Sequence, residues 1–153
     1  MKINIISVGK FDNSSINELF LEYQKRLKTK VFLKEIHHKY SNNIEEEKLK
    51  KIEGELIIKN IENESVRIFL DESGKNFTSK EFANILNKFN IEGHSTISFI
   101  IGGAYGLDKN IIGKNDLVLS LSKMTFPHLM VRIVLIEQIY RAFSIIANHP
   151  YHK

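Results

Sequence analysis

The chain has 153 residues, of which 42% are hydrophobic and 26% are charged, with eight glycines and two prolines. This composition is that of an ordinary folded protein, and the length predicts a single domain over residues 1–153 rather than a collagen-like or low-complexity chain. The sequence contains no cysteine, which excludes disulfide frameworks, thiolate metal sites and cysteine nucleophiles. Its apolar stretches are too short for a membrane span and no signal peptide is recognisable, so we expect a cytoplasmic protein without a membrane partner.

The net charge of +4 is distributed unevenly along the chain. From Leu121 onward the chain contains four basic residues and a single acidic residue, Glu137. An excess of Lys and Arg in one region favours a phosphate-bearing partner such as RNA, although a solvated surface of a slightly basic protein has the same pattern. The four basic residues are Lys123, Arg132, Arg141 and Lys153.

The first half of the chain alternates predicted strands and helices. Residues 2–8 and 31–37 are rich in Ile, Val, Leu and Phe and predict two strands. Between them, Ser14 or Ser15 is a suitable cap for an amphipathic helix. Asn42 or Asn43 then opens a highly charged helix whose apolar stripe is short, and residues 66–70 predict a third strand that ends in a turn over residues 71–75.

The second half continues the alternation. Thr78 and Glu81 have the spacing of a capping box, which predicts the start of a helix. Residues 96–101 and 117–121 predict two more strands, and a long helix is expected from Pro127 to about Ala147. The whole pattern indicates an α/β fold with a mostly parallel five-stranded sheet and helices on both faces. Open sheets bind ligands beyond the carboxyl ends of their strands, here after residues 70, 101 and 121.

Two of the segments that follow these strands have the composition of ligand-binding loops. The strand over residues 96–101 is followed by a glycine cluster at residues 102–106, and residues 120–128 mix small, polar and apolar side chains without a period. Each is equally compatible with a plain connection. Neither a P-loop motif nor a glycine-rich dinucleotide motif is present, which argues against an NTPase or a common NAD-binding enzyme.

The last predicted helix is apolar on nearly every side, so we expect it to be covered both by its own sheet and by a second copy of the chain. Arg132 lies within the apolar run and needs a carboxylate, a phosphate or a group of carbonyls as its partner. Glu137 and Arg141 are four residues apart and are expected to pair on the helix. His149 and His152 lack a third ligand, so no metal site is predicted.

Taken together, these segments resemble one family. The opening residues 1–10, the glycine cluster within residues 100–107, the segment 119–128, Val131-Arg132, residues 137–143 and the ending His149-Pro150-Tyr151-His152-Lys153 closely resemble the RlmH family. Its members are small bacterial SPOUT methyltransferases that modify a pseudouridine in the RNA of the large ribosomal subunit. The resemblance covers the whole chain, although residues 39–64 carry no family motif.

The resemblance implies a SPOUT-type fold with a C-terminal trefoil knot and a homodimer. It also implies S-adenosylmethionine as the cofactor, held by the three loops already identified. The cofactor-binding positions implied by the match are Leu70, Gly102, Leu121, Ser122, Lys123, Met124, Thr125 and Phe126.

The implied reaction is methyl transfer to N3 of a pseudouridine in 23S ribosomal RNA on assembled ribosomes. N3 carries a proton that has to leave, and without cysteine only direct displacement is open. We consider His128 as the general base that removes the proton. Arg132, Tyr151 and His152 are considered as groups that orient the target nucleobase or contact RNA. Two other hypotheses stay open, namely a non-catalytic RNA- or ribosome-binding module and a SPOUT methyltransferase acting on transfer RNA.

Overall fold

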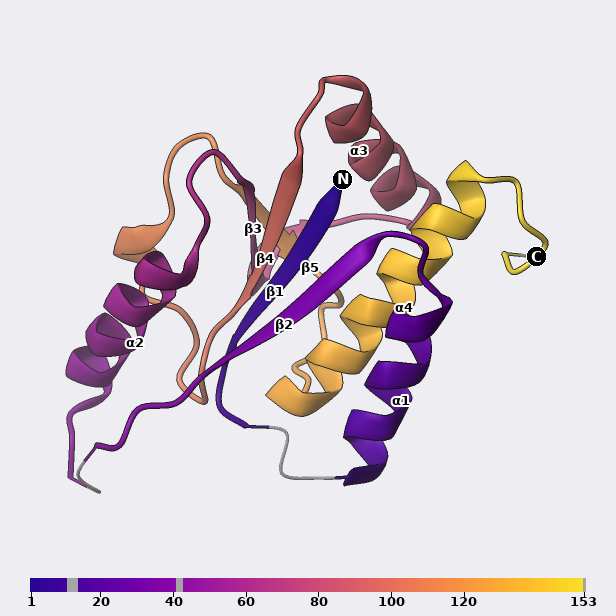
Figure 1. Ribbon diagram of the computed structural model, residues 1–153. Helices are drawn as coiled ribbons and strands as arrows, with labels where there is room; N and C mark the ends of the chain where they lie inside the picture. Colours follow the sequence, from indigo (N-terminus) through magenta and orange to yellow (C-terminus); the bar gives the residue numbers. More distant parts are fainter. Residues whose placement is uncertain (11–13, 41–42, 153) are drawn as a thin grey trace.

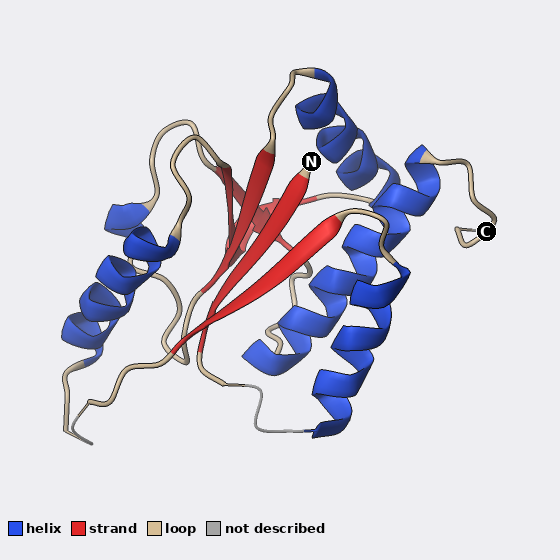
Figure 2. Cartoon of the chain, in the orientation of Figure 1, coloured by secondary structure: helices blue, strands red, loops and turns tan. Residues whose placement is uncertain are grey.

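The computed structural model describes residues 1–10, 14–40 and 43–152 and forms a three-layer α/β sandwich (Figures 1 and 2). The elements follow one another as β1 (Lys2–Val8), α1 (Ser14–Arg26), β2 (Lys30–Ile36), α2 (Glu46–Asn60), β3 (Val66–Asn76), α3 (Ser79–Ile91), β4 (Thr96–Ile101), the 3₁₀ turn η1 (Lys109–Ile111), β5 (Leu117–Ser120) and α4 (His128–Ile146). All five strands pair in parallel in the order β2-β1-β4-β3-β5. The predicted α/β fold with a parallel five-stranded sheet is confirmed, while the trefoil knot stays a prediction of the resemblance.

Helices cover both faces of the sheet, as the sequence pattern predicted (Figure 1). Helices α1, α3 and α4 pack on one face over a large apolar core, whereas α2 packs on the other face over a smaller core. The central strands β1 and β4 are buried almost throughout, which explains their nearly continuous apolar sequences.

Helix α4 lies between α1 and α3 (Figure 1). Part of the apolar surface of α4 that the sheet does not cover is therefore covered by these two helices rather than by a second copy of the chain. The side chains of Leu135, Ile136 and Ile139 are fully buried. Met130 remains exposed in the first turn of the helix. The apolar excess that sequence reasoning assigned to a partner is therefore confined to the beginning of α4.

Most predicted boundaries lie within one residue of the structure, and the capping box of α3 is present, since Thr78 Oγ1 accepts from Glu81 N at 3.2 Å. Two helix starts differ. Helix α1 already includes Ser14 and Ser15, so neither is its cap, and α2 begins at Glu46 rather than near Asn43. The alternative start at Asn42 lies outside the described residues.

Strand β3 does not end at Leu70 but continues to Asn76 after a bulge. Leu70 and Lys75 both pair with Leu119, so residues 71–74 are looped out of the ladder. The predicted turn is thus an insertion within a strand. Gly74 is required at its end, because a Cβ atom there would lie 2.8 Å from the backbone of Val118 and Leu119.

Candidate cofactor site

A cavity of about 880 Å³ opens at the carboxyl ends of β3, β4 and β5. It is the edge that the strand pattern indicated, and the volume lies in the range of pockets that bind small molecules. Seven of the eight positions implied by the resemblance line it, and Lys123 does not. The seven are Leu70, Gly102, Leu121, Ser122, Met124, Thr125 and Phe126.

The loop between β5 and α4 is shaped by hydrogen bonds from short polar side chains. Ser120 Oγ donates to the carbonyl of Ser122 at 2.8 Å, and Ser122 Oγ accepts from the amide of Met124 at 2.9 Å. Asn76 Nδ2 donates to the carbonyl of Ser120 at 3.0 Å. These contacts fix the backbone while Met124 and Phe126 stay exposed at the cavity.

The glycine loop after β4 is a tight turn in which the amide of Gly106 donates to the carbonyl of Gly103 at 3.0 Å. A Cβ atom on Gly102 would lie 2.7 Å from the Gly106 backbone, and Gly106 itself has a positive φ of 85°. Both positions therefore require glycine, and the turn exposes backbone to the cavity. The tight turn that the sequence left as one alternative is present and lines the cavity, while its role as a ligand-binding loop stays a prediction.

The bulge of β3 contributes an acidic wall to the cavity. Partial burial acts to raise the pKa of Asp71, but hydrogen bonds from the hydroxyl of Ser73 and from its amide, the latter at 2.9 Å, lower that pKa overall. Glu72 accepts from Thr125 Oγ1 at 3.0 Å and so connects the bulge to the loop before α4. Sequence reasoning missed both carboxylates, although their place directly after Leu70 was the available signal.

Lys50 and Lys109 also line the cavity and were not predicted. Lys50 comes from α2, in the stretch where no motif could be matched, and pairs with Glu46 at 3.5 Å and with Glu47. The cavity thus contains both acidic and basic side chains, which suits a ligand with charges of both signs.

His128 is the first residue of α4 and lines the cavity. Partial burial lowers the pKa of its imidazole, and the positive charge of Arg132 lowers that pKa further. A neutral imidazole at pH 7 is able to accept a proton. A Cβ atom on Gly9 would lie 3.5 Å from His128 Nε2, so the end of β1 packs against this ring.

Arg132 is fully buried, which corrects the expectation that it contacts RNA directly. Its Nε donates to Ser7 Oγ at 2.8 Å, and its Nη1 pairs with Glu35 Oε1 at 2.8 Å. Its Nη2 donates to the carbonyls of Val8 at 3.0 Å and Gly9 at 2.8 Å. The guanidinium is therefore paired with a carboxylate and with backbone carbonyls, as expected for an Arg in an apolar segment. These bonds fasten α4 to the ends of β1 and β2.

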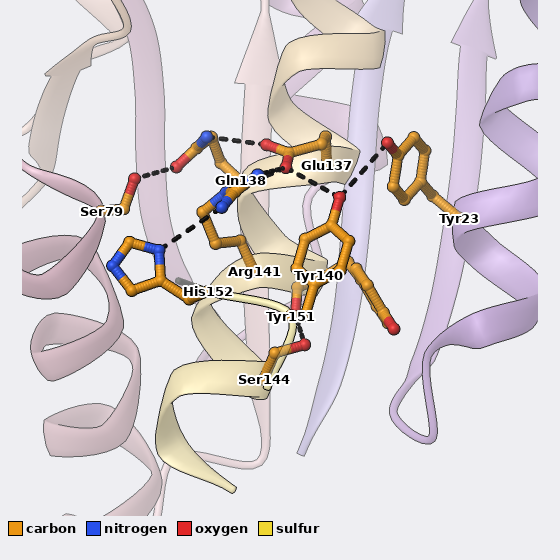
Figure 3. Close-up of polar contacts among 9 residues, drawn as sticks. All are labelled: Tyr23, Ser79, Glu137, Gln138, Tyr140, Arg141, Ser144, Tyr151 and His152. Atoms are coloured by element: carbon orange, nitrogen blue, oxygen red, sulfur yellow. Dashed lines mark hydrogen bonds and ion pairs between the residues drawn. The ribbon is translucent and has the colours of Figure 1, made fainter. Parts of the chain in front are cut away.

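The C-terminal tail packs on the second half of α4 (Figure 3), and neither Tyr151 nor His152 lines the cavity. Glu137 pairs with Arg141, as predicted, with an Nε to Oε1 distance of 2.9 Å. The same carboxylate accepts from Tyr151 Oη at 3.1 Å, while His152 Nδ1 lies 3.4 Å from Arg141 Nη1. Tyr23 of α1 completes the cluster, with its hydroxyl 3.4 Å from that of Tyr151.

The four predicted catalytic residues therefore form two separate groups. His128 and Arg132 lie in the first turns of α4, whereas Tyr151 and His152 contact residues 137–141, about 14 Å further along the helix at its rise of roughly 1.5 Å per residue. Burial, together with the neighbouring Tyr23 and Glu137, raises the pKa of Tyr151, so its phenol stays protonated at neutral pH.

Metal sites and membrane-spanning helices are considered for the described residues. No group of three or more His, Asp or Glu side chains among them is placed to hold a metal ion. None of the helices over the described ranges combines the length and the apolar character needed to cross a membrane.

A parallel sheet with a three-loop cavity at its carboxyl edge has the architecture in which α/β proteins bind small ligands. A family model described as "Predicted SPOUT methyltransferase" matches residues 1–152, and the chain belongs to this family. It is 43% identical to "Ribosomal RNA large subunit methyltransferase H" of Halothermothrix orenii and of Clostridium botulinum, and 40% identical to that of Acetivibrio thermocellus. Each comparison covers 100% of both chains.

The fold is also similar to that of a solved structure, "a probable methylase family protein from Haemophilus influenzae Rd KW20". The TM-score is 0.55 at 15% sequence identity, and the match covers 99% of this chain and 70% of the other. At this level of identity the likeness concerns the fold alone.

Proposed function

We propose that the chain is an S-adenosylmethionine-dependent methyltransferase that methylates N3 of a pseudouridine in 23S ribosomal RNA on assembled ribosomes, in the cytoplasm. The observation that carries the proposal is the cavity at the carboxyl edge of the sheet, which is lined by seven of the eight positions that the resemblance implied. The names of full-length relatives at 40–43% identity support ribosomal RNA as the substrate class.

The residues of the cavity fit S-adenosylmethionine, which carries a sulfonium, an ammonium and a carboxylate group. Asp71 and Glu72 supply negative charge for the two cationic groups, and Lys50 and Lys109 supply positive charge for the carboxylate. Gly102 permits close approach to the backbone, since it has no side chain at a crowded position.

S-adenosylmethionine supplies the electrophilic methyl group. The residues of this chain have to bind the target base, orient N3 and remove its proton, because the lone pair of N3–H is delocalised into the neighbouring carbonyl groups and N3 is a poor nucleophile until the proton leaves. Neutral His128 at the cavity is the group that accepts this proton in our proposal. Arg132 acts from behind it, by holding the end of β1 and keeping the imidazole neutral.

We further propose that the enzyme is a homodimer in which the tail of one protomer serves the cavity of the other. Tyr151 and His152 are bound near the far end of α4 and do not line the cavity of their own chain. The exposed apolar side chains of Met124, Phe126 and Met130 near the cavity provide a surface that a second copy would cover.

The corner between α1 and β2 is the proposed surface for RNA phosphates. Residues 23–34 include five basic and no acidic residues. All five cations are exposed, and Tyr23 at the start of this segment contacts Tyr151 of the tail. They are Lys25, Arg26, Lys28, Lys30 and Lys34.

The experiment that tests the function is methyl transfer from labelled S-adenosylmethionine to ribosomes that lack the modification. Naked ribosomal RNA and transfer RNA serve as parallel substrates, and nucleoside mass spectrometry identifies the product. We expect N3-methylpseudouridine on ribosomes only. Label in transfer RNA would replace our substrate assignment, and cofactor binding without transfer to any RNA would contradict the proposed reaction.

A further inference from the structure

Glu53 is a buried acidic residue that neither the cavity nor the tail explains. It lies in α2 on the face formed by Leu49 and Ile57, at positions four apart, and is 3% exposed. Its Oε2 atom has no hydrogen-bond partner among the described residues. A carboxylate in such a place is unusual, because buried ionised groups are normally paired.

The carboxyl group of Glu53 packs directly against the glycine loop of the cavity. A Cβ atom on Gly103 would lie 2.6 Å from Glu53 Oε2 and 2.9 Å from Oε1. The absence of a side chain at Gly103 therefore makes room for this carboxyl group. The same loop lines the cavity from Gly102 to Leu107, whereas Glu53 itself does not line it.

The burial of Glu53 is unfavourable for the fold by itself. Desolvation raises the pKa of the carboxyl group. Lys50, one turn earlier in α2, pairs with Glu46 and Glu47 instead. The next residue, Gly54, faces Asp108, which adds negative charge nearby. An apolar side chain at position 53 would avoid these penalties, so the carboxyl group calls for a role outside packing.

We propose that Glu53 is a positioning residue of the cofactor site, whose carboxylate accepts backbone N–H groups of the turn 103–106 when that turn closes on the cofactor. Gly103 has no side chain between the carboxyl group and the turn, and the amide of Gly106 already donates to the carbonyl of Gly103, so the donors that the proposal assigns to Glu53 are the amides of residues 103–105. The ligand on one side of the loop and Glu53 on the other would then hold the same backbone. This inference rests on the proposed function, since it assumes that the cavity binds S-adenosylmethionine.

Two variants test the inference in the full-length protein. Glu53→Met keeps the length of the side chain but removes both acceptors, while Glu53→Gln keeps one acceptor. The affinity for S-adenosylhomocysteine is measured by calorimetry, and the melting temperature is measured without ligand. For Glu53→Met we expect affinity at least about tenfold weaker, together with an unchanged melting temperature or one raised by about 2–4 °C. Glu53→Gln should stay within about threefold of the wild-type affinity.

A residue needed only for packing would give the opposite pattern, because Glu53→Met would then lower the melting temperature. That result, or wild-type affinity in Glu53→Met, overturns the role of Glu53. If the wild-type chain binds neither S-adenosylhomocysteine nor S-adenosylmethionine, the proposed cofactor is wrong, and this failure is distinguishable because it appears before any substitution is made.

Discussion

The two ends of helix α4 differ in how their polar groups are used. At the tail end, Glu137, Arg141, Tyr151 and His152 contact one another, so the cluster is already assembled. At the cavity end, Arg132 is fully engaged below the surface, while His128 and the loop before it face an open cavity. The polar groups at the cavity end thus border open space, whereas those at the tail end are occupied by contacts within the chain, and the following predictions test this difference.

Among the substitutions that test this difference, Arg132→Met should have the largest effect, a decrease in the free energy of unfolding. The substitution leaves Glu35, Ser7 and two carbonyls without their buried donor, and breaking a buried ion pair costs about 3–5 kcal/mol. We expect a loss of this size in the free energy of unfolding, measured with denaturant. Arg26→Ala, which breaks an exposed pair with Glu22, is the matched control and should change the free energy by less than about 1 kcal/mol.

If Arg132→Met proves as stable as the control, the guanidinium does not fasten α4 to β1 and β2. An unchanged free energy of unfolding combined with weaker ribosome binding would return Arg132 to the role in RNA contact that sequence reasoning gave it.

A second prediction concerns the packing beneath the cavity end. Gly103→Ala places a methyl group against the Glu53 carboxyl group and should destabilise the chain by about 1–3 kcal/mol. In a Glu53→Ala background the obstacle is absent, so the same substitution should cost less than about 0.5 kcal/mol. Thermal unfolding of all four proteins in the cycle measures the coupling, and additive effects would show that the two residues do not touch.

At the tail end, His152→Ala should lower turnover about tenfold and leave cofactor affinity unchanged, because the tail lies away from the cavity of its own chain. His149→Ala, in the same tail but exposed, is the control and should have wild-type turnover. Mixing His152→Ala with an inactive cavity variant tests the proposed sharing between protomers, since recovered activity requires a tail and a cavity from different chains. An equal loss of cofactor affinity in His152→Ala would contradict the separation of the two ends.

The sequence predicted the sheet and the edge with the cavity because these depend on local patterns. Strands β1 and β4 have the predicted boundaries, since apolar runs bounded by polar residues and glycine are unambiguous. The partners of Arg132 could not be predicted, because Ser7 and Glu35 are about a hundred residues away in sequence. Burial of Glu53 was predictable in principle, from its spacing of four residues to both Leu49 and Ile57.

The bulge of β3 shows a different limit. Residues 71–75 have a turn-like composition, and the segment does leave the ladder, but the strand resumes at Lys75 because Leu119 pairs on both sides of the insertion. Whether a turn ends a strand or interrupts it depends on the neighbouring strand, which local sequence does not describe. For the same reason the acidic wall of the cavity became visible only in the structure.

The smallest predicted effect is the pH dependence contributed by His128. Its pKa is lower in the folded chain than its ordinary value of 6.5, so the unfolded chain binds the proton more readily. Stability from this group is fully present above pH 6.5 and decreases as the pH falls from 6.5 through the lower folded pKa. His128→Gln should therefore flatten the stability profile in that interval, measured as unfolding free energy against pH. If His128→Gln keeps the wild-type slope, another group causes the difference in proton binding between the folded and the unfolded chain. That result would contradict the lowered pKa of His128 on which its role as a neutral base rests.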